Sequence, residues 1–528
     1  MTGRERNWWG WGFADARIDP HGIGAHAGAV LGLDGLGAVE DPVPLEAIAL
    51  PAPRLDVSAL PGGSTDKLDR IHHSLGKSYP DTIRAFRGAI DHVVDAVAHP
   101  ADEAGVEAVL EWAAGANAAV IPYGGGTSVV GGVEPRGLGG DGSSFDGVVS
   151  LDLTRLDRIL ELDEHSRAAR IQAGASGPVL ESQLREHGLT LRFFPQSFEL
   201  STLGGWLATR AGGHFATGRT HIDDLTESIR AVTPSGAWES RRLPGSGAGV
   251  SPDRMLLGSE GTLGVITEAW MRVQPRPEHR ASRAVRFGTF AAGCDAARAI
   301  VQAGLTPANL RLLDELEALQ TGAGDGSGAV LVVGVESPGV DVEDDLRRCL
   351  AICREHGGAY DDPAAKKAAD GAAGTVDTWR DAFLAMPYLR DALLRCGVLT
   401  DTFETAITWD RFPAFHAHVT GAVREALGEP CRVSCRFTHV YPDGPAPYYT
   451  VIAPARRGEE LAQWQRMKQA AGDAISSGGG TITHHHAVGR DHRPWYDVQR
   501  PDVFAAALTG AKQAVDPRGL LNPGVLIG

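Results

Sequence analysis

The pattern of apolar and polar positions divides the chain into short strands and amphipathic helices that are joined by glycine-rich loops. Between residues 92 and 117, a short apolar strand is followed by Pro-Ala-Asp at 100–102, a helix-start signature, and then by an amphipathic helix. The apolar residues 117–121 predict a second strand, which runs directly into the loop PYGGGTSVVGG at 122–132. The pattern therefore predicts a βα unit that ends in a glycine-rich loop.

Further along the chain, short apolar runs alternate with helical segments. We expect strands at 148–153, 158–163 and 168–176, and a helix at 178–187 that ends at Gly188. Another strand is expected in the sequence VITEAWMRV, at 265–273. This mixture predicts a fold of the α+β class.

The composition narrows the class of protein. With 528 residues, 43% of them hydrophobic, the chain is enzyme-sized and long enough for several domains. Its net charge of −16 argues against nonspecific binding of nucleic acid, which needs a basic surface. The six cysteines form no CxxC pair, so neither a zinc site nor a disulfide framework is indicated. No signal-peptide core and no membrane-spanning apolar run is found, and the Ala- and Arg-rich, Lys-poor composition indicates a bacterial source.

The loop at 122–132 is the strongest chemical signal. Glycine readily adopts positive φ angles, so successive amide groups in such a loop can turn toward one anion, and a diphosphate is the expected guest. The loop has neither the Lys-Ser/Thr of a P-loop nor a GxGxxG that opens a helix, which weakens an ATP or nicotinamide interpretation. A glycine-rich surface turn is the structural alternative.

Two more glycine-bearing segments favour a cofactor site over a surface turn. The segment at 195–229 places Ser201, Thr202, Gly204 and Gly205 at a helix start. The segment at 256–275 places a tight glycine-rich turn before the strand VITEAWMRV. Three such loops, each beside a strand or a helix start, are difficult to explain as coincident turns. We interpret them as walls of one site.

The triplet His484, His485 and His486 follows a short apparent strand at 481–483. If that strand continued, His484 and His486 would share one face and His485 the other. A tetrahedral metal site would also need nearby Cys, Asp or Glu partners, and none lies close in sequence, so we predict no metal. Clustered imidazoles suit acid–base work near neutral pH, and satisfied histidines at a strand end are the alternative.

Several other polar residues lie in apolar, strand-like surroundings. Arg311 is either a core arginine paired with Asp314 or a ligand for an anion. Arg436 could accept a substrate phosphate through its planar fork, or be an exposed strand residue. Tyr448 and Tyr449 are consecutive, so by the two-residue period of a strand only one can face inward.

Two further segments have alternative interpretations. Arg411 either walls a pocket or caps a helix. The helix-like segment 389–399 has an apolar face that is more often core, but it could line a tunnel for an acyl chain or dock on a membrane surface.

The three glycine-bearing loops, with PYGGGTSVVGG, STLGGW and GSEGTLGVITEA, resemble the FAD-binding domain of vanillyl-alcohol-oxidase-type flavoproteins. NWWGWGF, NLRLLDE, TFETAITWDR, SCRFTHVY and THHHAVG are similar to segments of the alkyldihydroxyacetonephosphate synthase family within that superfamily. The resemblance implies an α+β fold with a two-subdomain FAD-binding domain of the vanillyl-alcohol-oxidase/PCMH type and an α+β cap domain with an antiparallel sheet. The implied divisions are an N-terminal segment 1–84, an FAD domain 85–277, a cap 278–489 and a C-terminal segment 490–528 that returns to the flavin.

The resemblance also implies roles for individual residues. Tyr448 is favoured over Tyr449 as the catalytic hydroxyl. The implied catalytic residues are His484, His485, His486, Tyr448 and Arg311, and the implied substrate-binding residues are Arg436, Arg411 and Tyr449. The implied cofactor-binding residues are Pro122, Tyr123, Gly124, Gly125, Gly126, Thr127, Ser128, Gly131, Ser197, Ser201, Thr202, Gly204, Gly205, Glu260, Gly261, Gly264, Val265 and Ile266. No His or Cys lies in the 122–132 loop, so noncovalent FAD is expected.

The activity implied by the resemblance is the exchange of the acyl group of acyl-dihydroxyacetone phosphate for a fatty alcohol, through an adduct at flavin N5, as in ether lipid synthesis. The alternative is an FAD-dependent 2-hydroxy-acid dehydrogenase or oxidase of the D-lactate, glycolate or 2-hydroxyglutarate type. THVYPDG at 438–444 is a degraded version of the HGDGNLH motif of metal-dependent relatives in that branch. The chain also departs from the synthase pattern at Arg219-Thr220-His221 and at Ala487.

Partners and location are expected to follow from the lipid-type substrates. The resemblance leaves open peripheral contact with the inner face of a membrane and a homodimer. The chain ends without the peroxisomal signal SKL, and its cysteine usage favours the cytoplasm.

Overall fold

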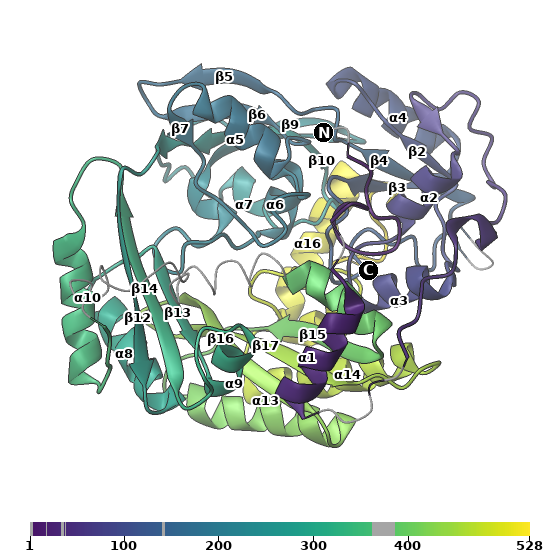
Figure 1. The fold of residues 1–528 in the computed structure, drawn as a ribbon. Coiled ribbons are helices and arrows are strands. Elements are labelled where there is room, and N and C mark those ends of the chain that lie inside the picture. Colours follow the sequence, from purple (N-terminus) through teal and green to yellow (C-terminus); the bar gives the residue numbers. More distant parts are fainter. Residues whose placement is uncertain are drawn as a thin grey trace.

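The computed structural model describes residues 4–16, 18–32, 36, 38–139, 143–361 and 386–527. The described residues form three main sheets, two smaller ones and a larger one. Figure 1 shows the larger sheet and its helices below the two smaller sheets.

The first small sheet carries the predicted βα unit. Its strand order is β1-β2-β4-β3, and β2, β4 and β3 run parallel. The helix α4 (Glu103–Gly115) connects β2 to β3, and the Asp102 side chain caps it by accepting a hydrogen bond from the amide of Gly105. The strands are β1 (Gly63–Ser64), β2 (Ala96–Ala98), β3 (Ala118–Tyr123) and β4 (Gly147–Asp152). Two helices lie between β1 and β2 along the chain, α2 (Lys67–Ser74) and α3 (Tyr79–Arg87).

The second small sheet is antiparallel, with the order β5-β6-β10-β8-β9. Its helices α5 (Gly177–Arg185) and α6 (Leu203–Thr209) contribute to one apolar core with the strands. The strands are β5 (Ile159–Asp163), β6 (Ala168–Gln172), β8 (Thr226–Thr233), β9 (Gly236–Glu239) and β10 (Val265–Arg272). Shorter elements beside them are β7 (Leu189–Thr190), β11 (Gln274–Pro275), η2 (Ile222–Leu225) and α7 (Pro252–Leu256).

The large sheet is antiparallel, with the order β12-β14-β13-β16-β17-β15. Apolar side chains from one of its faces pack against a layer of helices and form the largest core cluster. The strands are β12 (His279–Phe287), β13 (Asn309–Leu313), β14 (Ala329–Ser337), β15 (Val398–Glu404), β16 (Arg432–Val440) and β17 (Pro445–Pro454). The helices are α8 (Phe290–Gln302), α9 (Glu315–Gln320), α10 (Glu343–Glu355), α13 (Phe412–Leu427) and α14 (Glu460–Gly478).

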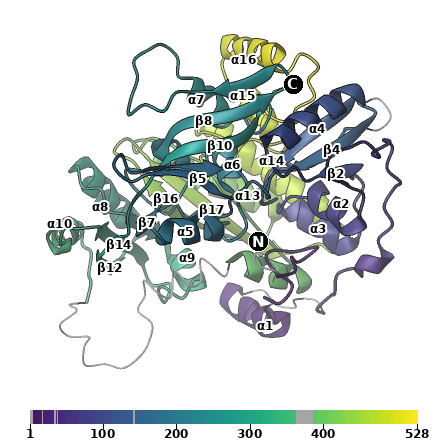
Figure 2. The same ribbon diagram turned by 90° about the horizontal axis from the view of Figure 1, so that it is seen from above.

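Both ends of the chain pack onto this body. In the N-terminal segment Trp9 stacks at a tilt on Phe86, with 5.3 Å between ring centroids. Helix α1 (Pro20–Leu31) packs near the helical residues 386–395, and Figures 1 and 2 both place it on the outside of the cap. After η1 (Leu45–Ala47), the chain enters the first small sheet.

The C-terminal segment returns to the edge of the first small sheet. After α15 (Arg493–Gln499) and α16 (Asp502–Val515), the Val120 amide donates to the Leu520 carbonyl and the Asn522 amide donates to the Val120 carbonyl, each at 2.8 Å. The predicted α+β class and the antiparallel cap sheet are confirmed.

Candidate active site

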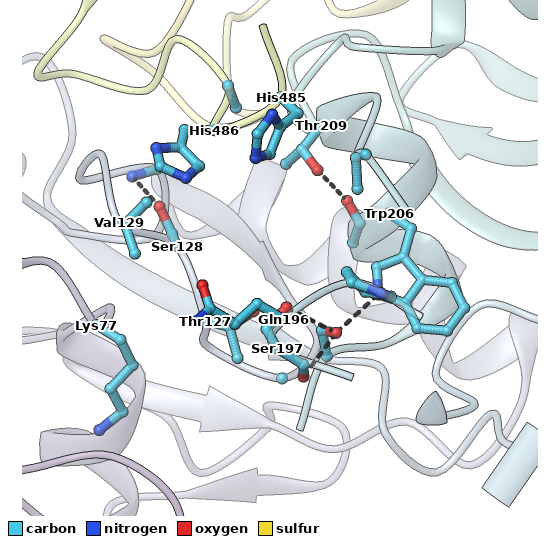
Figure 3. Close-up of a pocket in the computed structure, with 18 of the residues that line it drawn as sticks. Lys77, Thr127, Ser128, Val129, Gln196, Ser197, Trp206, Thr209, His485 and His486 are labelled. Carbon is cyan, nitrogen blue, oxygen red and sulfur yellow. Dashed lines mark hydrogen bonds between the residues drawn. The ribbon is translucent and has the colours of Figure 1, made fainter. Parts of the chain in front are cut away.

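A cavity of about 330 Å³ lies where the three glycine-rich loops meet the large sheet and the loop that follows α14. In Figure 3, His485 and His486 enter it from one side, Thr127 and Ser128 come from the first glycine loop, and Gln196 and Ser197 from the second. The sequence segments that were interpreted as walls of one site are therefore brought together.

The backbone of the first glycine loop packs closely against the second glycine-bearing loop. A Cβ atom on Gly125 would lie 2.1 Å from the carbonyl oxygen of Leu200, and one on Gly124 would lie 2.2 Å from the Thr202 hydroxyl. Gly126 has a φ of +65°, and its Cβ would lie 1.9 Å from the Tyr123 hydroxyl. Only glycine allows the two loops to approach this closely.

The hydrogen-bond donors of the cavity, and one buried polar atom in its lining, fit a diphosphate cofactor such as FAD. The bare backbone at 124–126 and the hydroxyls of Thr127 and Ser128 supply neutral donors for an anion. The Oδ1 atom of Asn522, which lines the cavity, is buried and has no partner among the residues that the structure describes, whereas its amide donates to the carbonyls of Gly132 and Glu260. We therefore assign the glycine loops and Asn522 as the groups that would hold FAD.

The second loop is held in place by its own hydroxyls. The Trp206 indole donates to the Ser201 hydroxyl at 2.7 Å, and Ser201 donates to the Ser197 carbonyl at 2.9 Å. These contacts fix the loop backbone beside the first glycine loop.

The third loop contributes Glu260, which lines the cavity and orients another loop. Its carboxylate accepts hydrogen bonds from the amides of Val488 and Gly489, at 2.9 and 2.8 Å. Burial raises the pKa of Glu260 to about 7, even though these two hydrogen bonds favour the ionised form. Glu260 thus ties the FAD-domain wall to the segment that follows the three histidines.

The large sheet presents alternate residues to the cavity. On β16, Arg436 and Thr438 face the cavity, while Cys435 and Phe437 belong to the apolar core on the opposite face. The same alternation holds on β17, where Tyr448 faces the cavity and Tyr449 packs in the core. The expectation that only one of the two tyrosines faces inward is met, and that residue is Tyr448.

Two buried arginines and a tyrosine form the polar centre of this face. The Arg436 guanidinium lies 4.0 Å from the centroid of the Tyr448 ring and forms an ion pair with Glu317. Arg311 lines the cavity and donates to the carbonyl of His214 at 3.1 Å. Burial, followed by the charge of Arg436, lowers the pKa of Arg311 to about 9. Two guanidinium groups thus face the same space, which favours an anionic ligand.

The histidine triplet lies in a loop, so the predicted strand at 481–483 is wrong. The carboxylate of Glu404, at the end of β15, accepts hydrogen bonds from the amides of His484, His485 and His486 at 2.7, 3.2 and 3.0 Å. It also accepts one from the Thr483 hydroxyl at 2.5 Å. Four donors on one carboxylate curl the backbone away from a strand and replace the alternation of faces.

The three imidazoles consequently point in different directions. His485 and His486 line the cavity, whereas His484 Nε2 lies 2.7 Å from the Tyr441 hydroxyl and 3.2 Å from His221 Nε2. Burial lowers the pKa of His485 to about 3 and that of His486 to about 4. For Glu404, burial raises the pKa, but the nearby imidazoles and the Thr483 hydroxyl hold it well below its ordinary value. The cavity therefore holds neutral imidazoles beside an ionised carboxylate.

Comparisons with known proteins agree with this geometry. The family described as "FAD binding domain" matches residues 94–240, and the family described as "FAD linked oxidases, C-terminal domain" matches residues 276–526. The alkyldihydroxyacetonephosphate synthase of Dictyostelium discoideum is 33% identical over 486 residues, which cover 88% of this chain and 78% of that protein. The chain belongs to the alkyldihydroxyacetonephosphate synthase family. A solved alkyldihydroxyacetonephosphate synthase superposes with a TM-score of 0.80 at 26% identity, covering 98% of this chain and 97% of its own.

The chain is thus an FAD-dependent enzyme of the synthase family, as the sequence predicted. The structure of p-cresol methylhydroxylase, with a TM-score of 0.67 at 14% identity and coverage of 88% of this chain and 93% of its own, shows the same fold. The predicted vanillyl-alcohol-oxidase/PCMH type of fold is confirmed by this likeness.

Most of the residues that the synthase resemblance singled out line the cavity, and five do not. The residues that do are Pro122, Tyr123, Gly124, Gly125, Gly126, Thr127, Ser128, Ser197, Ser201, Thr202, Gly204, Gly205, Glu260, Gly261, Gly264, Ile266, Arg311, Arg436, Tyr448, His485 and His486. The five that do not are Gly131, Val265, His484, Arg411 and Tyr449.

Each of these five has another environment. Val265 is fully buried in the core of the first small sheet, and Gly131 lies at a turn with a φ of +69°. Arg411 stands at the N-cap position of α13 without a side-chain cap hydrogen bond there, and its guanidinium donates to the carbonyl of Gly478, the last residue of α14, at 2.6 Å, so the helix-cap alternative holds. The Tyr449 ring stacks on Phe403 in the cap core, on the face opposite the cavity. The His484 ring lies against two rings that line the cavity, those of His439 and His485, with centroids 4.9 and 5.3 Å away.

Several residues of this synthase-family site were missed. Glu404 lies inside the quoted segment TFETAITWDR, but a carboxylate that accepts backbone amides 80 residues later leaves no local pattern. Lys77 lines the cavity, donates to the Gly10 carbonyl at 2.7 Å, and has its pKa lowered to about 7 by burial. His221 and His439 were noted only as parts of RTH and THVYPDG. Their clustering with the triplet appears only in three dimensions.

Proposed function

We propose that this chain exchanges the acyloxy group of acyl-dihydroxyacetone phosphate for a fatty alcohol, and releases a fatty acid and an alkyl ether. The observation that supports this proposal most directly is the lining of the cavity. Arg311, Arg436 and Tyr448 line it together with His485 and His486, and the glycine loops form another part of the lining. Atoms and electrons balance in this exchange without an external oxidant. FAD, when bound, supplies the electron-accepting ring system that makes the C1 position of the substrate reactive.

The charged part of the substrate would be held on the large sheet. A phosphate carries two negative charges near neutral pH, and the two buried guanidiniums of Arg311 and Arg436 face the cavity. Glu317 forms an ion pair with Arg436, and Arg311 donates to the carbonyl of His214. The Tyr448 hydroxyl donates to Thr402 at 2.9 Å, and this contact holds its ring against Arg436.

The proton at C1 of the substrate would be taken by a histidine. A general base must be unprotonated at working pH, and burial keeps His485 and His486 neutral, with pKa values of about 3 and about 4. His485 lies against Glu404, with 3.5 Å between Nδ1 and Oε2, and a carboxylate there stabilises an imidazole that gains a proton. We assign His485 as the base.

The apolar chains would use the apolar part of the lining of the same cavity. Trp11, Phe194, Trp206 and Met386 contribute to this lining. Two chains have to occupy this space in turn, because the acid leaves before the alcohol enters. No helix in the described ranges is long and apolar enough to cross a membrane. Delivery of such substrates at a membrane surface, a cytoplasmic location, a bacterial source and a homodimer all stay predictions.

The test is to mix the FAD-loaded enzyme anaerobically with palmitoyl-dihydroxyacetone phosphate and hexadecanol. We expect stoichiometric release of palmitate without any electron acceptor, and a decrease in turnover of roughly 10²- to 10⁴-fold in His485→Asn. The contrary result is an enzyme that ignores this pair but is reduced by D-lactate, glycolate or 2-hydroxyglutarate and needs a quinone or oxygen for turnover. That outcome would establish the hydroxy-acid dehydrogenase instead.

A further inference from the structure

A chain of three imidazoles leads from the cavity to a half-buried histidine outside it. His485 Nδ1 lies 3.0 Å from His484 Nδ1, and His484 Nε2 lies 3.2 Å from His221 Nε2. His221 Nδ1 in turn lies 2.9 Å from the carbonyl oxygen of Arg210. Each of these contacts has room for one shared hydrogen.

The carbonyl at the outer end fixes where each hydrogen lies. A carbonyl oxygen only accepts, so His221 carries its hydrogen on Nδ1 and, when neutral, has a lone pair on Nε2. His484 must then donate from Nε2, which leaves a lone pair on His484 Nδ1. His485 must donate from Nδ1. Its Nε2 is therefore the lone-pair nitrogen of a ring that lines the cavity.

The inner end of the chain favours the same arrangement independently. The Glu404 carboxylate, another pure acceptor, lies 3.5 Å from His485 Nδ1. It therefore also favours a hydrogen on that nitrogen. Both ends of the chain thus select the form of His485 that can accept a proton at Nε2.

The opposite arrangement requires a proton on His221. If Tyr441 donated to His484 Nε2, at 2.7 Å, His484 would donate to His485, and Nε2 of His485 would carry a hydrogen and could not act as a base. Neutral His221 would then direct a lone pair at the lone pair of His484 across 3.2 Å. With neutral His221, Tyr441 instead accepts from His484 and donates to the Thr220 hydroxyl at 2.9 Å.

We propose that His221 and His484 are positioning residues that hold His485 in its base-competent tautomer and relay the proton taken from the substrate to the outside of the site. The identity of that proton, at C1 of the substrate, rests on the proposed function. The tautomers do not.

The relay is balanced at each nitrogen. As His485 Nε2 gains the substrate proton, its Nδ1 hydrogen passes to His484 Nδ1, and the Nε2 hydrogen of His484 passes to His221 Nε2. One N–H bond breaks and one forms on His484 and on His485, so both end neutral. The positive charge resides on His221, which loses the proton to water.

The packing allows this approach because of a glycine. A Cβ atom on Gly212 would lie 3.0 Å from His439 Cε1 and 3.1 Å from His485 Cβ. His439 Nε2 lies 3.2 Å from the Gly213 carbonyl, so its Nδ1 is a buried lone pair that finds no partner in the described part of the chain. The ring nitrogens of His439, His484 and His485 come within 4.8 Å of one another.

The pH behaviour of the relay depends on the charged and titratable groups around it. Those that face the three imidazoles come from the loops, from β15 to β17 and from α14. They are Arg210, Glu404, Arg436, His439, Tyr441, Tyr448, Lys468 and His486.

A spectroscopic test needs no substrate. Nitrogen NMR of FAD-loaded enzyme with ¹⁵N-labelled histidine reports which ring nitrogen of each residue carries hydrogen, and single variants assign the signals. We expect Nδ1–H on His221 and His485 and Nε2–H on His484. In His221→Phe, Tyr441 can donate to His484 and only Glu404 still favours Nδ1–H on His485, so a fraction of His485 should shift to Nε2–H. A wild-type His485 with Nε2–H, or a variant in which the two tautomers keep their wild-type proportions, would overturn the proposal.

A kinetic test separates the relay from a structural role. We expect His221→Ala to lower the turnover roughly tenfold or more and added imidazole to restore part of it, whereas His221→Gln should keep the tautomer through its amide oxygen but lose the proton transfer. His187→Ala removes an exposed histidine on the far side of the second small sheet and serves as the control.

The outcomes of the kinetic test are distinct. Full activity in His221→Ala would show that His485 and Glu404 act alone and would contradict the relay. If the wild type fails to use the proposed substrates while the tautomers are as expected, the proposed function fails and the positioning role stands. A third outcome is one tightly bound metal ion per chain that is lost in His439→Ala. Such an ion would take the place of the hydrogen shared by His484 and His485, and this result would also contradict the relay.

Discussion

The cavity has two walls that are built differently. The FAD-domain wall is backbone, formed by loops in which Gly124, Gly125 and Gly126 leave no space for a side chain. The cap wall consists of side chains. They come from alternate residues of β16 and β17 and from the loop whose amides donate to Glu404. The first wall offers shape and neutral donors, while the second offers charge and ionisable groups.

This difference assigns separate tasks to the two walls. The backbone of the glycine loops cannot titrate and varies little with sequence, so it suits a cofactor that stays bound. A side-chain wall changes its chemistry with each substitution, so it suits the substrate and the reacting atoms. We therefore expect changes in the first wall to remove FAD, and changes in the second to remove activity while FAD stays bound.

The largest effect is expected from Gly125→Ala. The new methyl group would lie 2.1 Å from the Leu200 carbonyl, so the two loops would have to separate. We expect FAD affinity to fall at least about 100-fold, which flavin absorbance after gel filtration would measure. Gly115→Ala, at a glycine whose Cβ would meet nothing within 4 Å, is the matched control and should retain FAD.

The next effect is expected from Glu404→Gln, which acts on the cap wall. The amide cannot accept all four hydrogen bonds that the carboxylate accepts from Thr483 and the histidine amides. We expect turnover to fall roughly 10- to 100-fold, because charge-assisted hydrogen bonds that position His485 are lost. FAD absorbance should be unchanged. Parallel loss of FAD and of activity would show that the two walls are not independent.

A smaller effect is expected from Arg436→Lys. Lysine keeps the charge but loses the planar fork that stacks on Tyr448. We expect the KM for the phosphate-bearing substrate to rise about tenfold with little change in kcat. Arg411→Lys alters the same residue type on the same domain, outside the cavity, and should change the KM less than about twofold. Equal effects of the two substitutions would remove Arg436 from the substrate site.

The mildest perturbation is pH, which acts only on ionisable side chains. Burial lowers the pKa of nine histidines, so the folded protein keeps them neutral while the unfolded chain protonates them as the pH falls below about 6.5. They are His72, His92, His214, His416, His439, His484, His485, His486 and His492.

The sign of the pH effect follows from proton counts. Between pH 7 and pH 5.5 the unfolded chain binds more protons at these histidines than the folded protein does. The free energy of unfolding therefore decreases as the pH is lowered. Glu260 and Asp314 act in the opposite direction, because burial raises their pKa values to about 7 and the folded state keeps their protons. Burial also raises the pKa of Asp81, Asp391 and Asp491, which has the same sign. The nine histidines outnumber these carboxyl groups, and we expect the Tm to fall by several degrees, roughly, over this range in a calorimetric scan. A rising Tm would contradict the neutral histidine cluster.

The backbone wall could be predicted from the sequence, and the side-chain wall only in part. Glycine loops beside strand ends are local patterns, so the residues at 122–128, 201–205 and 260–266 were identified with few exceptions. The choice of Tyr448 over Tyr449 depended on a strand period and an alignment, and both are also local.

The errors came from contacts between distant residues. Nothing near the triplet indicates that Glu404 accepts its amides, so a strand was expected and His484 was placed in the cavity. Arg411 carries the same signal as Arg436, an arginine in an apolar motif, and only the tertiary fold shows that one caps a helix and the other faces the cavity. The link between His221 and His484 joins residues that are 263 positions apart.

The proposed exchange of the acyloxy group for a fatty alcohol is tested most directly by following the oxygen of the alcohol. FAD-loaded enzyme is mixed anaerobically with palmitoyl-dihydroxyacetone phosphate and ¹⁸O-labelled hexadecanol, and the masses of the products are measured by mass spectrometry. We expect hexadecyl-dihydroxyacetone phosphate that carries ¹⁸O in its ether bond, with one palmitate released per ether formed and no electron acceptor consumed. Absence of the labelled ether, together with turnover of a hydroxy acid that requires an acceptor, would contradict it.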